Sequence, residues 1–454
     1  MICSQRTRQL YSSLLRKGSF TQNVVLNIGG NGLNMIISLT LTPILSRVYP
    51  PSEYGNFTVF SSIMSIMVLV STFGYSKALL FSSEEDIIPL VVLNTIIILL
   101  FGIFVGLLII IGNRIVLPLL KLGFLQSDAW IIPLFITFFS LLGIVSNYFI
   151  RTNDFRKHVL INNFQNLIAR ITAITFGLVL TPTAFGLIVG QVIGYFGNLF
   201  LYFKRIITKT IVSLKSSKQI NFFLLFKKYK NYPLYILPSD LLGFVNLSVP
   251  VIIFAYVFQK SDIGQYAFAS SLLGLPVNYL SQSFGKTLTQ KSMEYYPSNV
   301  PQFQLTIERT VKVLLTVTFI PYFVIVLFGE NIFRWFLGSQ WSKAGVFSQV
   351  MAIYYFARAV GGPIINVLNA LRKEKLVILF HSTFVPLSLV TIFISSWWSH
   401  NMIVVFWSIS AIDSIFFAFI ILMTLKLTNI SFRKLTFQFI LLTAVLALIS
   451  YLKQ

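Results

Sequence analysis

Four ionisable side chains lie inside long apolar stretches, where they could do chemistry. Arg170, Asp240, Arg358 and Asp413 each interrupt a run of about twenty mostly apolar residues. An arginine or aspartate in the middle of a membrane span costs roughly 2.5 to 3.5 kcal/mol, so each needs a partner, water or a function. The arginines could line an anion site or form structural ion pairs with the two aspartates. The aspartates could bind a proton or a sodium ion.

Amide side chains form rows at helical spacing around these charges. Residues three or four positions apart share one face of a helix, so each row predicts a polar wall turned away from lipid. Each amide could simply hydrogen-bond a neighbouring helix, which is worth about 0.6 kcal/mol; three rows, two with a guanidinium, favour a hydrated cavity. The rows are Asn23, Asn27, Asn31, Asn34 and Ser38; Asn162, Asn166 and Arg170; and Tyr354, Arg358, Gly362, Asn366 and Asn369.

Cofactor, metal and nucleic-acid chemistry are not expected. The single cysteine, Cys3, allows no thiolate cluster, and the three histidines never stand at the spacing of a ligand pair. No Gly-rich Lys-Ser/Thr loop for ATP occurs. The net charge of +22 comes from basic residues in short loops, whereas nucleic-acid binding needs them clustered on a water-facing fold.

The elements that carry these side chains are predicted to be membrane-spanning helices. Of 454 residues, 56% are hydrophobic and 11% charged, which predicts an all-α polytopic protein of about twelve spans. Residues 435–452 form either a thirteenth span or a peripheral helix. The predicted spans are 22–46, 57–81, 88–111, 129–150, 159–181, 184–203, 233–257, 263–286, 311–333, 345–370, 376–397 and 401–424.

The positive charges predict a cytoplasmic N-terminus. With that orientation, 26 of the 35 Lys and Arg residues lie in cytoplasmic segments and only 7 in outer ones, as the positive-inside rule requires. The sequence SSEED at 82–86 carries acids on the same side, but acidic residues weigh little in that rule.

An internal repeat predicts two lobes. SEYGNFTVFSSI at 52–63 recurs as SDIGQYAFASSL at 261–272, an offset of 209 residues. We therefore expect two six-helix lobes in one orientation around a central cavity. Pro43 and Pro250 occupy similar places in the two repeats and are predicted hinges, because proline removes a helical hydrogen bond. The predicted domains are lobe 1–203, basic linker 204–232, lobe 233–424 and extra helix 425–454.

The order of elements over residues 20–424 resembles the polysaccharide transport family of the multidrug/oligosaccharidyl-lipid/polysaccharide flippase superfamily. Pro43, Arg47 and Tyr49, followed by Glu53-Tyr54-Gly55, are similar to the opening signature of that family. The short basic loops at 151–157 and 372–375 also resemble its turns.

The resemblance implies a non-enzymatic flippase of the bacterial inner membrane. It would move undecaprenyl-diphosphate-linked oligosaccharide, for O-antigen, lipopolysaccharide or capsule, to the outer leaflet by alternating access. The implied partners are this lipid, membrane lipid and other polysaccharide assembly proteins, with the chain a monomer. Asp240 and Asp413 are the predicted ion-coupling residues. The predicted substrate-binding residues, which include Lys77 from the cationic cavity that the family implies, are Asn27, Asn31, Asn34, Lys77, Asn166, Arg170, Arg358 and Asn366.

Two other functions remain open on the sequence alone. A cation-coupled drug antiporter of the same superfamily would depend on Asp240 and Asp413 and not on Arg170 or Arg358. A membrane polysaccharide polymerase would need a sizeable outer loop, and the longest one here, about 112–128, holds roughly 17 residues.

Overall fold

The fold is all-helical over the residues that the structure describes. The computed structural model describes residues 20–151, 155–196, 222–296, 298–371, 373–428 and 432–453, and no strand occurs among them. Helices are expected here because a chain in lipid must satisfy its backbone hydrogen bonds internally. The expected all-α, multi-pass architecture is confirmed.

The chain divides into two compact units, Met1–Ser248 and Val249–Gln454. The division falls inside α10, whose first half is tied to the first unit by an ion pair from Asp240. Residues 204–221 of the expected linker lie outside the described residues, and the assignment of lobes and linker stays a prediction.

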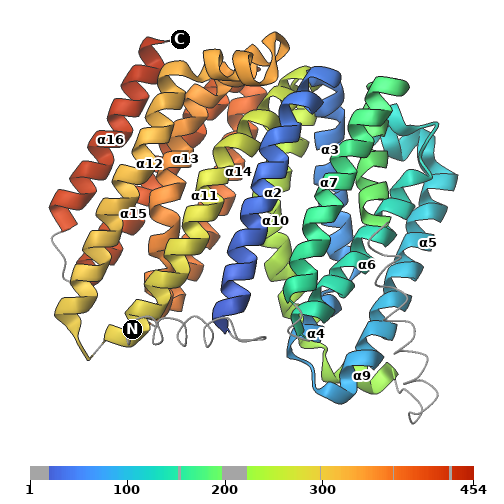
Figure 1. Ribbon diagram of the computed structural model, residues 1–454, viewed down its shortest axis with the longest axis horizontal. Coiled ribbons are helices and arrows are strands. Elements are labelled where there is room, and N and C mark those ends of the chain that lie inside the picture. Colours follow the sequence, from blue (N-terminus) through green and yellow to red (C-terminus); the bar gives the residue numbers. More distant parts are fainter. Residues whose placement is uncertain are drawn as a thin grey trace, which may run out of the picture. The chain divides into compact units, whose positions relative to one another are not determined.

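In the first unit, α2 and α7 pack along one another, and α6 packs against α3, α4 and α5 (Figure 1). A core of aromatic and branched side chains, including Tyr75, Leu90 and Phe149, joins α4, α5 and α6. The elements are α2 (Phe20–Val48), α3 (Pro51–Ser71), α4 (Tyr75–Phe81), η1 (Glu84–Asp86), α5 (Ile87–Leu119), η2 (Gly123–Leu125), α6 (Ile131–Arg151), α7 (Phe155–Val179), the helix Ala184–Phe196, α9 (Phe222–Lys228), η3 (Tyr232–Ile236) and the start of α10 (Leu237–Val257).

In the second unit, α13 is the central helix and packs against α11, α12 and α15 (Figure 1). The C-terminal helix α16 packs on α12, α13 and α15 and is long and apolar enough to cross a membrane. The elements are α11 (Lys260–Tyr295), α12 (Val300–Leu337), η4 (Ser339–Trp341), α13 (Ser342–Ala370), α14 (Glu374–Ser399), α15 (Met402–Leu427) and α16 (Phe432–Leu452).

Eight helices in the described part of the chain could cross a membrane, or nine if the broken segment at Tyr232–Val257 is one span. Four further predicted spans, on α2, α7, α11 and Ala184–Phe196, are helical but fall short in described length or apolar character. In α2 the apolar described part, Gly32–Val48, is too short, whereas α7 carries one of the amide rows, which lowers its apolar character.

One predicted span was wrong in its continuity. The stretch 57–81 is not a single helix, because α3 ends at Ser71 and α4 begins at Tyr75. Phe73 and Gly74 have φ angles of 46° and 75°, a left-handed conformation that interrupts a helix and that glycine adopts readily. The break turns α4 so that Lys77 can meet α10.

Candidate functional site

Two of the predicted polar rows form one hydrogen-bonded seam between α2 and α7. Asn166 of α7 donates to Asn34 and to the Ser38 hydroxyl of α2, the latter at 3.1 Å. Asn34, Ser38 and Thr42 recur every four residues, so they present one edge of α2 to α7. The helical spacing thus brings both rows face to face.

Arg170 extends this seam by one turn. Its Nε donates to Asn166 at 2.8 Å, its Nη1 to Thr42 at 2.9 Å and its Nη2 to Ser38 at 3.3 Å. All three partners are neutral, and among the described residues no carboxylate lies within ion-pair distance of this guanidinium. An arginine has five N–H donors, so two remain without a partner in the described part of the chain.

A polar cavity of about 340 Å³ opens beside the seam. Its wall consists almost entirely of amides, with one tyrosine hydroxyl, and none of its lining residues is charged. The lining residues are Asn34, Asn162, Gln165, Asn166, Ala169, Gln191 and Tyr195.

Glycines hold the helix Ala184–Phe196 against α7, and so place Gln191 and Tyr195 at the cavity. A Cβ atom at Gly190 would lie 2.6 Å from the carbonyl oxygen of Ala169. At Gly194 it would lie 2.7 Å from the carbonyl oxygen of Gln165. This small-xxx-small spacing lets two backbones approach closely.

The loop after α2 is also hydrogen-bonded to α7. Tyr49 is fully buried and its hydroxyl donates to the carbonyl oxygen of Ala173 at 2.7 Å. Burial raises the pKa of Tyr49 to about 12. The contact anchors the end of α2 to α7 beyond Arg170.

Lys77 pairs with Asp240 instead of standing free. Its ammonium lies 2.6 Å from Asp240 Oδ1, and the two side chains are 47% and 18% exposed. The other carboxylate oxygen of Asp240 is buried and has no hydrogen-bond partner in the described part of the protein. The pair ties α4 to α10.

Arg358 and Asp413 form a second pair, in the other unit, between α13 and α15. Arg358 Nε donates to Asp413 Oδ2 at 2.5 Å, and its guanidinium carbon lies 5.0 Å from the ring centroid of Tyr354. Asp413 is completely buried, and its second oxygen has no hydrogen-bond partner among the described residues. Of the two interpretations of Arg358, the structure shows the ion pair.

The remaining predicted site residues are distributed over both units. The Asn366 amide lies 2.6 Å from where a Cβ of Gly285 would stand, so it contacts α11. Asn27 and Asn31 lie on α2, but their side chains fall outside the described residues. Pro43 lies inside an unbroken α2, whereas the apolar segment with Pro250 is broken between Val245 and Leu247.

Comparison with known proteins now identifies the family. The sequence profile of a family described as polysaccharide biosynthesis protein matches residues 44–346, more than half of the chain. The chain belongs to the polysaccharide biosynthesis protein family. No match was found among curated protein sequences. The expected membership of a polysaccharide family is confirmed.

Solved structures show where the fold of this polysaccharide biosynthesis protein occurs. A lipid II flippase MurJ in an inward closed conformation is similar with a TM-score of 0.68 and 13% identity, over 95% of this chain and 99% of that one. The MATE multidrug transporter DinF-BH in complex with R6G has a TM-score of 0.61 and 14% identity, over 90% of this chain and 96% of that one. An inward-facing multidrug resistance MATE family transporter has a TM-score of 0.60 and 11% identity, over 90% of this chain and 99% of that one. The shared fold is that of flippases and transporters.

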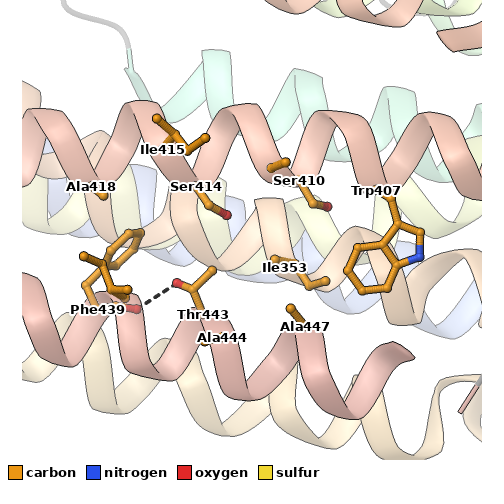
Figure 2. A pocket seen from close by; sticks show the side chains of 12 residues that line it. Ile353, Trp407, Ser410, Ser414, Ile415, Ala418, Phe439, Thr443, Ala444 and Ala447 are labelled. Carbon is orange, nitrogen blue, oxygen red and sulfur yellow. Dashed lines mark hydrogen bonds between the residues drawn. The ribbon is translucent and has the colours of Figure 1, made fainter. Parts of the chain in front are cut away.

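An apolar groove in the second unit contrasts with the amide cavity. It encloses about 520 Å³ between α15 and α16, with Ile353 of α13 also lining it (Figure 2). Small side chains such as Ala418, Ala444 and Ala447 line it, and Trp407 lies at one end (Figure 2). The groove has no charged lining residue, so it does not suit a charged headgroup.

Some residues of the seam and its cavity were not predicted. Thr42 continues the four-residue spacing of Asn34 and Ser38, so the same periodicity could have included it. Gln191 and Tyr195 lie on a separate helix, and only the fold brings them to Asn166. The pairing of Lys77 with Asp240, 163 residues apart, likewise has no signal in local spacing.

Proposed function

We propose that this protein moves undecaprenyl-diphosphate-linked oligosaccharide from the cytoplasmic to the outer leaflet of the bacterial inner membrane. The repeat units would serve O-antigen, lipopolysaccharide or capsule synthesis, and the two halves would alternate in access. Membership of a polysaccharide biosynthesis family and a fold shared with a lipid II flippase support this proposal.

Arg170 is the observation that carries the proposal. Its positive charge is balanced by no carboxylate among the described residues, although it lies in a predicted span. An ionisable side chain at such depth marks a substrate path by default. Two N–H groups beyond the three hydrogen bonds described above suit the paired oxygens of a phosphate, which arginine binds in a planar fork.

The other assigned residues have roles that depend on Arg170. The amides Asn27, Asn31, Asn34 and Asn166 would offer N–H donors to the diphosphate along the same seam. Arg358, Asn366 and Lys77 would act in a later step, because both cations must first leave their carboxylates. Asp240 and Asp413, once released, would take up the coupling proton or cation.

Replacement of Arg170 tests the proposal. We expect Arg170→Ala to abolish flipping of undecaprenyl-diphosphate-linked oligosaccharide in proteoliposomes and surface polysaccharide in cells, at wild-type protein levels. Arg170→Lys should show little more flipping than Arg170→Ala, because an ammonium cannot bind two oxygens in the planar geometry of a guanidinium. Lys312→Ala serves as the control, since Lys312 pairs with Glu308 one turn away on α12 with its side chain 51% exposed.

Full activity of Arg170→Ala would contradict the proposal. The drug antiporter hypothesis makes the opposite prediction, namely that Asp240→Asn stops efflux of an organic cation while Arg170→Ala does not. The structural similarity to multidrug transporters makes this the competing outcome to measure in the same vesicles.

A further inference from the structure

A second cavity lies in the first unit, next to the amide cavity. It encloses about 310 Å³ between α3, α4, α6, the helix Ala184–Phe196 and the start of α10, and twelve residues line it. This is the lower end of the range for small-molecule sites. Neither the family match nor the Arg170 seam accounts for it.

Hydroxyl groups form one wall of this cavity. Ser61 and Ser65 come from α3, Thr72 from the turn after it, Ser76 from α4 and Ser140 from α6. The Ser61 hydroxyl is buried and has no hydrogen-bond partner within the described ranges. Ser65 and Thr72 donate to the carbonyls of Ser61 and Leu69, at 2.7 and 3.1 Å. The Thr72 oxygen also accepts from the Gly74 N–H at 3.3 Å. A hydroxyl oxygen has two lone pairs, so the Ser65 oxygen keeps both and the Thr72 oxygen keeps one for a ligand. The wall therefore offers several acceptors and a free donor.

Aromatic rings also line the cavity. Phe135 and Phe139 of α6 stack with ring centroids 3.9 Å apart, and Phe139 also lies 3.9 Å from the ring of Tyr195. Phe244 of α10 lines the cavity as well. A sugar ring has C–H faces and a rim of hydroxyls, which match an aromatic wall and a hydroxyl wall respectively.

The charge of the lining restricts which sugars fit. All twelve lining residues are uncharged, so the carboxylate of a uronic acid would be buried without a cation, which is costly. Lys77 follows Ser76 in the chain, but its ammonium is held by Asp240. The cavity favours a neutral sugar.

Gln191 connects this cavity to the amide cavity, because it lines both. The amide cavity shares Asn166 with the Arg170 seam. A diphosphate on Arg170 would therefore have its attached sugar on the Gln191 side.

We propose that the serine- and phenylalanine-lined cavity of the first unit is a binding subsite for an uncharged sugar attached to the diphosphate. The assignment rests on the proposed function and deepens it: the Arg170 seam holds the anionic headgroup, and Ser61, Ser65 and Gln191 hold the sugar. The substrate class is a polyprenyl diphosphate whose lipid-proximal sugar is neutral.

Binding of three lipids to the full-length purified protein tests the subsite. The three probes are undecaprenyl diphosphate, the same lipid carrying one N-acetylglucosamine, and the same lipid carrying one glucuronic acid. Their affinities for the protein in nanodiscs are measured by microscale thermophoresis. We expect the wild type to bind the N-acetylglucosamine lipid about tenfold more tightly than the other two, as one or two extra hydrogen bonds provide.

Variants then separate the two subsites. Ser65→Leu fills the cavity and should remove the tenfold gain, whereas Ser62→Leu, on the same helix but outside the lining, should keep it. Ser61→Ala with Ser65→Ala gives a second variant that adds no volume, and it should reduce the gain. Arg170→Ala should weaken binding of all three lipids.

The outcomes are distinguishable. An undiminished gain in both Ser65→Leu and the double alanine variant would overturn the sugar subsite while leaving the diphosphate site intact. Equal affinity of the wild type for the lipids with and without N-acetylglucosamine would do the same. Failure of the wild type to bind any of the three lipids would overturn the proposed function together with the subsite.

Discussion

The two arginines in the predicted spans differ in what balances their charge. Arg358 lies against the buried carboxylate of Asp413 at 2.5 Å, whereas Arg170 bonds only amide and hydroxyl oxygens among the described residues. Sequence spacing treats the two alike, since both stand in polar rows. Arg358 would therefore have to leave Asp413 before it could bind an anion, whereas Arg170 would not have to leave a carboxylate.

The Arg358–Asp413 pair can be measured with a double-mutant cycle. Arg358→Met alone should destabilise the protein by about 3 to 5 kcal/mol, because it leaves the Asp413 carboxylate buried and unpaired. The double variant Arg358→Met/Asp413→Asn should recover most of that loss, since no buried charge remains. Thermal unfolding of the protein in detergent gives the comparison.

An exposed pair provides the control for this cycle. Arg334 bonds Glu330 one turn away on α12, with side chains 55% and 44% exposed, so Arg334→Ala should cost less than about 1 kcal/mol. A double variant no more stable than Arg358→Met would show that the two charges do not stabilise each other.

Helices pack most closely where glycine permits it. The contact of Ala184–Phe196 with α7 depends on Gly190, whose Cβ would lie 2.6 Å from a carbonyl oxygen and 2.8 Å from Ala173 Cβ. We expect Gly190→Ala to destabilise the protein by roughly 1 to 3 kcal/mol, because neither neighbour can move without a backbone shift. Thermal unfolding measures the effect.

Gly243→Ala is the matched control for this substitution. Gly243 is also helical, and an added Cβ would meet nothing within 4 Å. This alanine should be neutral or stabilise the helix, by up to about 1 kcal/mol. Equal effects of the two substitutions would contradict close packing at Gly190.

Pro250 provides a test of the proposed hinge. The apolar segment is broken between Val245 and Leu247. In a regular helix the ring of Pro250 would clash with the backbone carbonyl four residues earlier, which lies at this break. Pro250→Ala should straighten this segment and slow flipping several-fold, while lipid binding stays unchanged. Pro386→Ala, in an unbroken α14, is the control, and an unaltered rate in Pro250→Ala would remove Pro250 as a hinge.

Sequence periodicity predicts most of the helices and their polar faces, but it does not predict which residues of different helices contact one another. The four-residue spacing predicted that Asn166 and Arg170 share one face of their helix, because helical faces follow from spacing. It did not predict that this face meets Asn34 of α2, which only the fold shows. The break after Ser71 was not predicted, since apolar composition continues through it. The partner of Asp240 could not be read from the sequence either, because it depends on how α4 and α10 pack.

The whole chain is a multi-pass membrane protein with the fold of flippases and MATE transporters. Its orientation remains a prediction from the distribution of Lys and Arg. The single cysteine, Cys3, makes that prediction simple to test, because a Cys3→Ser background has no other thiol.

Labelling with a membrane-impermeant maleimide should report the orientation. In that background, Ser127→Cys should react in intact cells and Gln302→Cys only after permeabilisation. Both positions are exposed, Ser127 in the turn before α6 and Gln302 in the first turn of α12, and the predicted topology assigns them to opposite sides. The Cys3→Ser protein alone is the blank. Reaction of Gln302→Cys in intact cells, with none at Ser127→Cys, would invert the topology.

The close glycine contact between Ala184–Phe196 and α7 has a mechanical consequence. Gly190 and Gly194 let the two helices approach closely at backbone atoms, so we expect a shift of one helix to displace the other. Gln191 and Tyr195 would then move together with Arg170. The sugar subsite and the diphosphate site would keep a fixed separation while the first unit moves.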